Sequence, residues 1–268
     1  MAVVEIEINN YVAVLTLNRP EARNALNPEL IVALARSWEQ LADDDSVRAI
    51  VITGAEGSTF CSGFDLGTTI PLMTGSREPQ DEYEQAVADD MGLMGRATLR
   101  DFDPGKPTIA AVNGHAIAGG MELMLACDLR AVASGVRLGL SEVALGLIPG
   151  MGGTARLARH VPRAIAMELL LTAQPMSSDA LAETGLINRL VRVEDVLAAA
   201  VDLASTIAAN APLAARAARS VIRACDDLTE LDALALEAER GRELVETEDA
   251  REGPRAFIEK RMPVFTGR

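Results

Sequence analysis

The chain of 268 residues is short of several residue types, and each shortage excludes a class of protein. Lysine occurs only at Lys106 and Lys260, and there is no basic run. The 39 acidic residues outnumber the 25 basic ones, so the net charge is −14. Nucleic acid and anionic membranes are therefore disfavoured as partners, because either needs a basic face. Aromatic residues make up only 3% of the chain, yet the hydrophobic fraction of 49% still allows a sizeable core.

Cysteine and histidine are also scarce. Cys61, Cys127 and Cys225 are widely spaced among apolar neighbours, which indicates buried thiols in a reducing compartment rather than a disulfide framework. The two histidines, with no H-E-x-x-H, C-x-x-C or G-x-S-x-G pattern, disfavour a metal site or a histidine-based triad. The start, MAVVEIEINN, lacks the cations of a leader, and the apolar stretch 108–127 contains polar residues and glycines. We therefore expect a cytoplasmic protein without a membrane span.

Apolar strands alternate with helices along most of the chain, which is typical of an α/β fold. Two alternating runs predict a hairpin over 3–8 and 11–17, and Asn27-Pro28 predicts the start of a helix over 28–42. Because the later strands are apolar on both faces, they favour parallel βα units. The further expected elements are strands at 49–53, 108–112, 129–133 and 186–191, and helices around 80–100, over 160–172, between Ser177 and Gly185, and from Val193 onward.

This pattern divides the chain into a βα core at 1–192 and a helical region at 193–268. The helical region carries an apolar stripe that must pack on the core or on another subunit. Its members are Leu228, Leu231, Leu234, Ala238 and Val245. Within the core, the acidic and glycine-dotted segment 67–103 is either a mobile flap over a site or an ordinary surface insertion.

Glu122 is the first candidate for chemistry. It stands in the first turn of an apolar helix that opens with Gly119-Gly120, where free N–H groups make the helix end receptive to an anion. Apolar neighbours should desolvate this carboxyl group and raise its pKa toward the range useful for proton transfer. The competing interpretation is that Glu122 merely complements the helix dipole.

A second carboxyl group, that of Glu142, lies in an equally apolar run. The two acids could form an acid/base pair if the chain brings them together, which spacing alone does not show. The following run Gly150–Ala155 matches a dinucleotide-binding pattern by letter, but its context is wrong for one and favours a tight turn before a helix. The loop after the strand at 49–53 could offer N–H donors near Gly63, and His115 either lines a pocket or stands in a turn.

Five segments in order resemble the enoyl-CoA hydratase/isomerase, or crotonase, superfamily over nearly the whole chain. They are LTLNRPEARNAL at 15–26, AIVITGAEGSTFCSGFDL at 49–66, KPTIAAVNGHAIAGGMELMLACDLR at 106–130, LGLSEVALGLIPGMGGTARLAR at 138–159 and AFIEKRMPVF at 256–265. The resemblance implies a crotonase-like spiral of ββα units with a C-terminal α-helical trimerisation region. It implies a homo-oligomer, either a trimer or a hexamer built as a dimer of trimers.

The resemblance also implies an acyl-CoA thioester substrate and no separate cofactor or metal. The thioester oxygen would be held by an oxyanion hole made of the backbone N–H groups of Phe64 and Gly119. Glu122 would act as general base on a water molecule, and Glu142 would manage the proton at the α-carbon. Because the isomerase branch generally keeps only the second acid, the presence of both favours hydration. A specialised isomerase or dehydratase, and a non-catalytic CoA-binding subunit, are the alternatives.

The remaining site residues follow from the same resemblance. Those assigned to the substrate or to CoA are Ala22, Arg23, Ser62, Asp65, Leu66, Phe257 and Lys260, the last two from a neighbouring subunit. Lys260 could instead be a solvated cation. The chain departs from the family pattern in the bulky Phe64 at a donor position and in the segment 67–103, so the length of the acyl group stays open.

Overall fold

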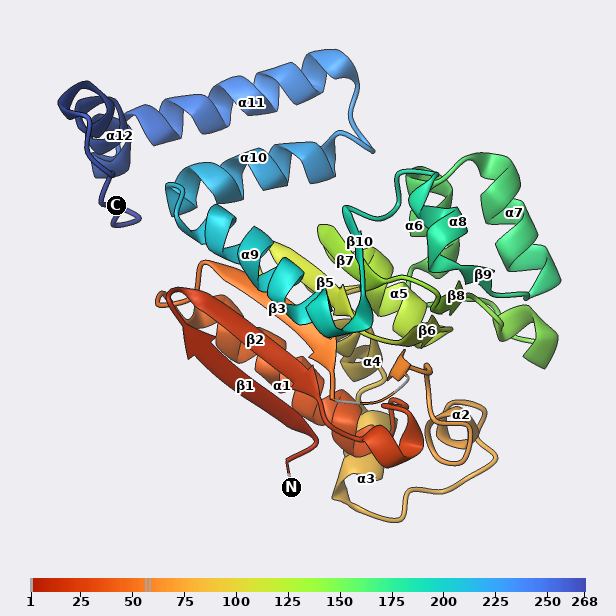
Figure 1. Ribbon diagram of the computed structural model, residues 1–268. Helices are drawn as coiled ribbons and strands as arrows, with labels where there is room; N and C mark the ends of the chain where they lie inside the picture. The colour runs from red at the N-terminus through yellow and green to blue at the C-terminus, as the bar shows by residue number, and fades with distance from the viewer. Residues whose placement is uncertain (1, 56, 58) are drawn as a thin grey trace.

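The computed structural model describes residues 2–55, 57 and 59–268, and it folds around two β-sheets (Figure 1). The larger, six-stranded sheet has the order β1-β2-β3-β5-β7-β10. Its strands are β1 (Val4–Asn9), β2 (Val12–Leu17), β3 (Ala49–Gly54), β5 (Thr108–Val112), β7 (Leu129–Ala133) and β10 (Arg189–Val191). The β1–β2 hairpin is antiparallel and every other pair in this sheet is parallel. These pairings confirm the predicted hairpin and parallel βα units.

A smaller, four-stranded sheet has the order β4-β6-β8-β9. Its strands are β4 (Thr59–Cys61), β6 (His115–Ile117), β8 (Arg137–Gly139) and β9 (Met176–Ser177). Strands β3, β5 and β7 of the large sheet are each followed by one strand of the small sheet. The chain therefore winds as a spiral of ββα units, which confirms the predicted fold class.

Helices follow these strand pairs and cover the sheets. Helix α1 (Pro28–Asp43) begins at the predicted Asn27, whose side chain accepts a hydrogen bond from the Leu30 N–H group. The segment 67–103 contains three short helices, where sequence analysis expected one: α2 (Thr69–Met73), α3 (Glu82–Asp89) and α4 (Gly92–Ala97). The helix predicted over 160–172 is wrong in its bounds, because Pro162 separates α6 (Gly153–His160) from α7 (Arg163–Thr172). The remaining helices of the core are α5 (Gly119–Ala126) and α8 (Ser178–Ala182).

The chain after β10 is helical, as predicted. Helix α9 (Val196–Ala208) packs its buried alanines on the large sheet, whereas α10 (Pro212–Ala224), α11 (Glu230–Val245) and α12 (Glu248–Glu259) extend away from it (Figure 1). On α11 the apolar stripe is open to solvent, with Leu231 77% and Val245 73% exposed. Whether 193–268 is a separate oligomerisation unit stays a prediction.

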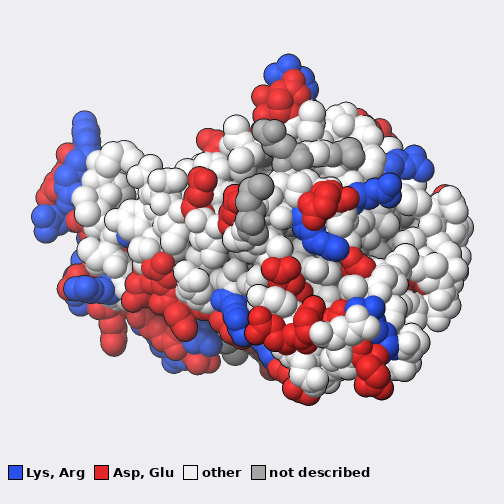
Figure 2. Space-filling view, turned by 90° about the horizontal axis from the view of Figure 1, so that it is seen from below, with Lys and Arg blue, Asp and Glu red and all other residues white. Residues whose placement is uncertain are grey.

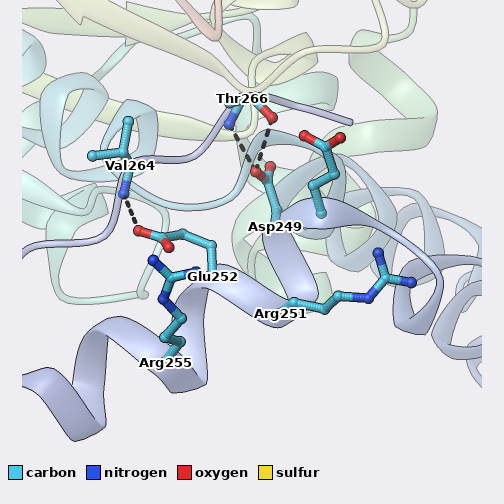
Figure 3. Close-up of a pocket in the computed structure, with 7 residues that line it drawn as sticks. Asp249, Arg251, Glu252, Arg255, Val264 and Thr266 are labelled. Atoms are coloured by element: carbon cyan, nitrogen blue, oxygen red, sulfur yellow. Dashed lines mark hydrogen bonds between the residues drawn. The ribbon is translucent and has the colours of Figure 1, made fainter.

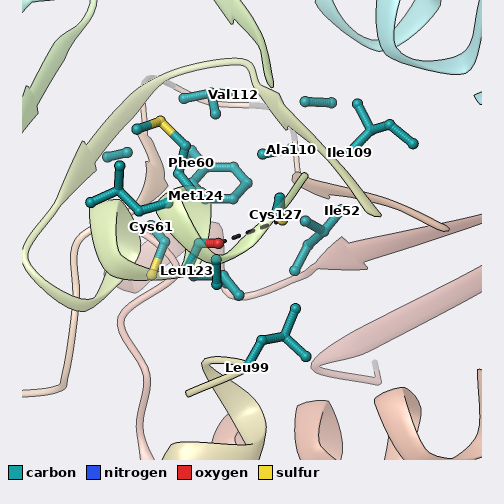
Figure 4. Close-up of a cluster of buried hydrophobic side chains, with 14 of the residues drawn as sticks. Ile52, Phe60, Cys61, Leu99, Ile109, Ala110, Val112, Leu123, Met124 and Cys127 are labelled. Carbon is teal, nitrogen blue, oxygen red and sulfur yellow. Dashed lines mark hydrogen bonds between the residues drawn. The ribbon is translucent and has the colours of Figure 1, made fainter. Parts of the chain in front are cut away.

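The hydrophobic core joins buried side chains of both sheets with those of α5, α1 and α9. Figure 4 shows Phe60, Leu123 and Met124 packed against side chains of β3 and β5. Cys61 and Cys127 are buried there as expected, but Cys225 is exposed, so its predicted burial is wrong. Cys225 follows the last turn of α10, which lies outside this core.

Acidic side chains outnumber basic ones on the face shown in Figure 2, in keeping with the net charge of −14. Among the described residues, no individual helix has the length and apolar composition needed to cross a membrane. One pair of helices, Val193–Ala208 with Pro212–Ala224, satisfies the length and composition criteria jointly, although the chain bends by 109° between the two helices.

Candidate active site

Three neighbouring parallel strands of the small sheet end beside one another, and each leads into a candidate functional segment. Strand β4 leads to Ser62–Phe64, β6 to the start of α5, and β8 to the short 3₁₀ helix η2 (Glu142–Leu145). Because parallel strands present their carboxyl ends at the same edge of a sheet, segments far apart in sequence meet there. This topology brings the predicted residues 64, 119, 122 and 142 together.

The contact between the first two segments requires glycine. A Cβ atom at Gly120 would lie 2.1 Å from the carbonyl oxygen of Cys61, and one at Gly63 would lie 3.0 Å from the Gly119 nitrogen. Gly63 also has a φ of 90°, which side-chain-bearing residues rarely adopt. Ala118, just before α5, has a φ of 52°. The glycines and this strained alanine let α5 start directly against the end of β4.

The close approach places two backbone N–H groups side by side. The Leu26 N–H donates to the Gly63 carbonyl at 2.8 Å, and the Asp65 N–H donates to the Leu26 carbonyl at 3.1 Å. These bonds clamp the chain on both sides of Phe64. Within the described part of the chain, neither the Phe64 nor the Gly119 N–H group donates to a protein acceptor. Two fixed, unused donors are what an oxyanion hole requires.

Glu122 is almost completely buried, with 1% of its surface exposed. Its Oε1 atom accepts hydrogen bonds from the N–H groups of Met151, at 2.7 Å, and Gly153, at 2.9 Å. Burial raises the pKa of this carboxyl group, while the two N–H donors and the nearby Arg156 and Arg100 guanidinium groups act in the opposite direction. The donors hold one carboxylate oxygen in place and leave the other free of these bonds.

Glu142 lies in a different environment. Both of its carboxylate oxygens are buried without a hydrogen-bond partner among the described residues. Burial, followed by the charge of Glu122, raises the pKa of Glu142 to about 7. Glu122 stands in the helix that follows β6 and Glu142 just after β8, and these two strands are paired in the small sheet. Neighbouring acids whose environments differ in this way suit a proton donor and a proton acceptor.

The predicted Ala22, Arg23 and Ser62 lie next to the donor segment. The Ser62 N–H donates to the Arg23 carbonyl at 3.2 Å, and Arg23 adopts a left-handed backbone with a φ of 57°. The Arg23 side chain is exposed, so its guanidinium group faces solvent beside the site. This position is open to a charged part of a ligand.

Asp65 and Leu66 differ in what they contact. The Asp65 carboxylate pairs with Arg19 Nη1 at 2.7 Å and accepts a hydrogen bond from the Gly67 N–H at 2.9 Å. These bonds hold the start of the segment 67–103. The Leu66 side chain is 63% exposed.

Phe257 and Lys260 lie on or just after α12, at the far end of the C-terminal helices from α5 and β6 (Figure 1). Phe257 is 85% exposed. A hollow beside the same helix is lined in part by the returning C-terminal chain, where Glu252 accepts from the Val264 N–H and Asp249 from the Thr266 N–H (Figure 3). In one chain these residues are therefore separate from the candidate site.

The run Gly150–Gly153 has a role that the sequence does not predict, because its pattern indicates only a tight turn that opens a helix. That turn exists, and α6 begins at Gly153, but its N–H groups also hold the Glu122 carboxylate. The signal was available, because a helix that starts with glycine leaves N–H donors free for an acid. His115 stands in β6, where its Nδ1 atom accepts from the Arg137 N–H at 2.9 Å.

Comparison with known proteins agrees with this geometry. A profile of the enoyl-CoA hydratase/isomerase family matches residues 7–268, and the chain belongs to that family. It is 36% identical to the enoyl-CoA hydratase EchA19 of Mycobacterium tuberculosis, over 98% of this chain and 96% of the relative. It is also 36% identical to a short-chain-enoyl-CoA hydratase of Clostridium acetobutylicum, over 96% and 95%. A crystal structure of enoyl-CoA hydratase from M. tuberculosis H37Rv superposes with a TM-score of 0.89, at 36% identity and full coverage of both chains.

Proposed function

We propose that the protein is an enoyl-CoA hydratase, which adds water to a trans-2-enoyl-CoA and gives a 3-hydroxyacyl-CoA. The observation that carries this proposal is that the paired strands β4, β6 and β8 lead into two acids with buried carboxyl groups, Glu122 and Glu142, and into the unused N–H donors of Phe64 and Gly119. Isomerisation would need only one acid. The family relationship supports the same substrate class.

The N–H pair would bind the thioester oxygen. When water adds to the double bond, negative charge develops on that oxygen as an enolate forms. Donors that already point at this position stabilise the charge without rearranging, and one such donor is typically worth about 10²–10³ in rate. Gly63 and Gly120 contribute indirectly, because they allow the donors to approach each other.

The two acids would move the protons. Glu122, ionised and held by Met151 and Gly153, takes a proton from water as the water oxygen bonds to C3 of the substrate. Glu142, kept protonated by its raised pKa, gives a proton to C2. Hydrogen and hydroxyl are thus added across the double bond. The pair holds one proton before and after the reaction, and no redox step occurs.

This scheme predicts the pH dependence. Because the active pair holds a single proton, kcat/KM for hydration and for dehydration should share one bell-shaped profile. The alkaline limb should lie near the raised pKa of Glu142, about 7, since above it the pair loses its proton. The acid limb should mark protonation of Glu122. Initial rates in both directions across the pH range check this prediction. A kcat/KM that does not fall between pH 7 and 9 would contradict it.

The direct test of the function is loss of the conjugated-thioester absorbance of crotonyl-CoA and of longer enoyl-CoAs when the protein is added. Formation of the 3-hydroxyacyl-CoA, identified by mass, supports hydration. Shift of a 3-enoyl-CoA double bond without water addition would indicate an isomerase instead. Calorimetric binding of CoA with no turnover of any chain length would identify a binding subunit and overturn the proposal.

Phe64 should limit the acyl group beside the thioester. Its ring lies 3.3 Å from where a Cβ atom of Gly119 would stand, next to the two donors. We expect Phe64→Ala to raise the kcat/KM of a C2-methylated enoyl-CoA relative to crotonyl-CoA by about tenfold or more, because one methyl group in a pocket is worth about 10–200-fold. The backbone donor remains, so crotonyl-CoA should still react. An unchanged ratio would show that the ring lies away from the acyl group.

We further propose that the protein works as a trimer or a hexamer in the cytoplasm. Support for assembly comes from the exposed apolar residues of the C-terminal helices and the chain that follows them, which have no cover within one chain. They include Ile222, Leu231, Val245, Phe257, Ile258, Met262 and Val264. In such an assembly Phe257 and Lys260 could reach a neighbour's CoA. Sedimentation at micromolar concentration tests this, and a monomer would contradict it.

A further inference from the structure

Arg156 of α6 bridges two loops that border the candidate site. Its Nη1 atom donates to the Met151 carbonyl at 3.3 Å, and its Nη2 atom donates to the Leu99 carbonyl at 2.6 Å. Met151 is one of the two residues whose N–H groups hold Glu122. The guanidinium group therefore fixes a residue that positions the proposed base.

The neighbouring glycine shows that this arrangement is tightly packed. Gly152 has a φ of 104°, and a Cβ atom there would lie 2.7 Å from Arg156 Nη1. The chain thus turns around the guanidinium group, which a side chain at Gly152 would displace. Gly153, the next residue, donates the second hydrogen bond to Glu122.

The other end of the bridge lies at the close of the segment 67–103. Leu99 has a left-handed φ of 54° and is 3% exposed, with its side chain in the core cluster of Figure 4. Trp38 of α1 donates from Nε1 to the carbonyl of Ala97, two residues earlier, at 3.1 Å. The Leu99 side chain and the Ala97 carbonyl thus anchor this end of the segment, and Arg156 connects it to the loop that holds Glu122.

We propose that Arg156 is a positioning residue for the base Glu122, acting by holding the Met151 and Leu99 carbonyls together. The inference rests on the proposed hydratase function. Arg156 need not contact the substrate, since it acts through the Met151 N–H group. Two different guanidinium nitrogens bond the two carbonyls, which suits the forked donors of arginine better than the single ammonium group of lysine.

Several charged groups lie near Glu122 and Arg156 and influence how the activity depends on pH. Arg156 of α6 and Arg100 lower the pKa of Glu122, and Glu142 of η2 is the neighbouring acid. Arg156 itself is surrounded by Arg223 of α10, Cys127, Glu122 and Asp101. Removing the positive charge of Arg156 should therefore raise the pKa of Glu122 and move the acid limb of kcat/KM to higher pH.

Two substitutions separate geometry from charge. We expect Arg156→Gln to lower kcat for crotonyl-CoA by about 10²-fold, the cost of misplacing a catalytic group by about 1 Å, with KM changed less than threefold. The acid limb of kcat/KM in this variant should move to higher pH. Arg156→Lys keeps the charge, so its pH profile should match the parent's, yet kcat should stay at least about tenfold low because one ammonium group does not hold both carbonyls.

The matched control is Arg159→Gln on the same helix. Arg159 is 46% exposed and pairs with Asp226 and Asp227, away from Glu122. Its kcat should stay within about twofold of the parent's. Melting temperature and circular dichroism show which variants are folded. If Arg156→Gln does not fold, Arg156→Lys carries the test by itself.

A readout independent of turnover distinguishes this inference from the function on which it rests. The titration of an isotope-labelled Glu122 carboxyl group, assigned with Glu122→Gln, should move to higher pH in Arg156→Gln and stay in place in Arg159→Gln. A parent protein without hydratase activity would overturn the proposed function. An active parent with an unchanged kcat in Arg156→Gln, full recovery of kcat in Arg156→Lys, or an unmoved Glu122 titration would overturn the role of Arg156.

Discussion

Glu142→Gln is expected to lower kcat/KM for crotonyl-CoA hydration by about 10²–10⁴-fold, the usual contribution of a general acid or base. The amide has nearly the same shape as the carboxyl group but cannot deliver a proton to C2. The alkaline limb that we assign to Glu142 should disappear with the carboxyl group. Steady-state kinetics across the pH range measure both effects.

The stability of this variant distinguishes a functional acid from a structural one. Folding raises the pKa of Glu142 from its usual 4.5 to about 7, so the folded protein retains a proton that the unfolded chain loses. The contribution of this group to the free energy of unfolding therefore falls as the pH rises from about 4.5 to 7. Above that range the group destabilises the folded protein by its full amount. We expect Glu142→Gln at pH 8 to melt no lower than the parent.

The exposed Glu168→Gln on α7 is the matched control, and its activity and melting temperature should not change. Hydration by Glu142→Gln at more than one tenth of the parental rate would remove Glu142 from the proton-transfer scheme.

Gly120→Ala should have the largest effect on the folded structure. The added methyl group would lie 2.1 Å from the Cys61 carbonyl oxygen and clash with backbone that has no freedom to rotate away. We expect the free energy of unfolding to fall by about 3 kcal/mol, at the upper end of the usual cost of overpacking. Helix α5 must move away from β4, which separates the Gly119 and Phe64 donors and should cost at least about 10² in kcat.

Gly241→Ala in α11 is the control for this change. Within the described part of one chain, no atom outside the helix's own backbone lies within 4 Å of the Cβ position at Gly241, and a methyl group there extends the apolar stripe of α11. Alanine there should stabilise the protein by up to about 1 kcal/mol, because glycine is a poor helix former. Urea denaturation measures both variants. A Gly120→Ala protein as stable and as active as the parent would show that α5 can shift without consequence for the site.

The large sheet could be predicted from the sequence, whereas the small one could not. Strands such as 49–53 and 108–112 are buried on both faces and stand out as apolar runs. Strands β4, β6 and β8 have three residues each, too few for a periodic pattern. Helix bounds were misjudged where a helix began inside a glycine run, as α6 does at Gly153, since glycine usually indicates a turn.

The site residues themselves were found partly by chemistry and partly by resemblance. Apolar surroundings identified Glu122 and Glu142 as desolvated acids, and their raised pKa values agree with that reasoning. Sequence spacing could not show that they meet, because the meeting depends on the small sheet. The Arg156 bridge depends on Leu99, 57 positions away, so no local pattern in the sequence indicates it.

The ends of β4, β6 and β8 deliver the donors and the acids from adjacent rows of one hydrogen-bonded sheet. Neighbouring strands in such a sheet cannot slide apart one at a time without breaking their ladder, so the reacting groups should keep their mutual spacing while the substrate enters and leaves. The connection that departs after Phe64 belongs to neither sheet, and its helices α3 and α4 pack on α1 instead. Changes there could alter which acyl chain is accepted and leave the proton chemistry intact, a separation that would let one architecture serve many thioesters.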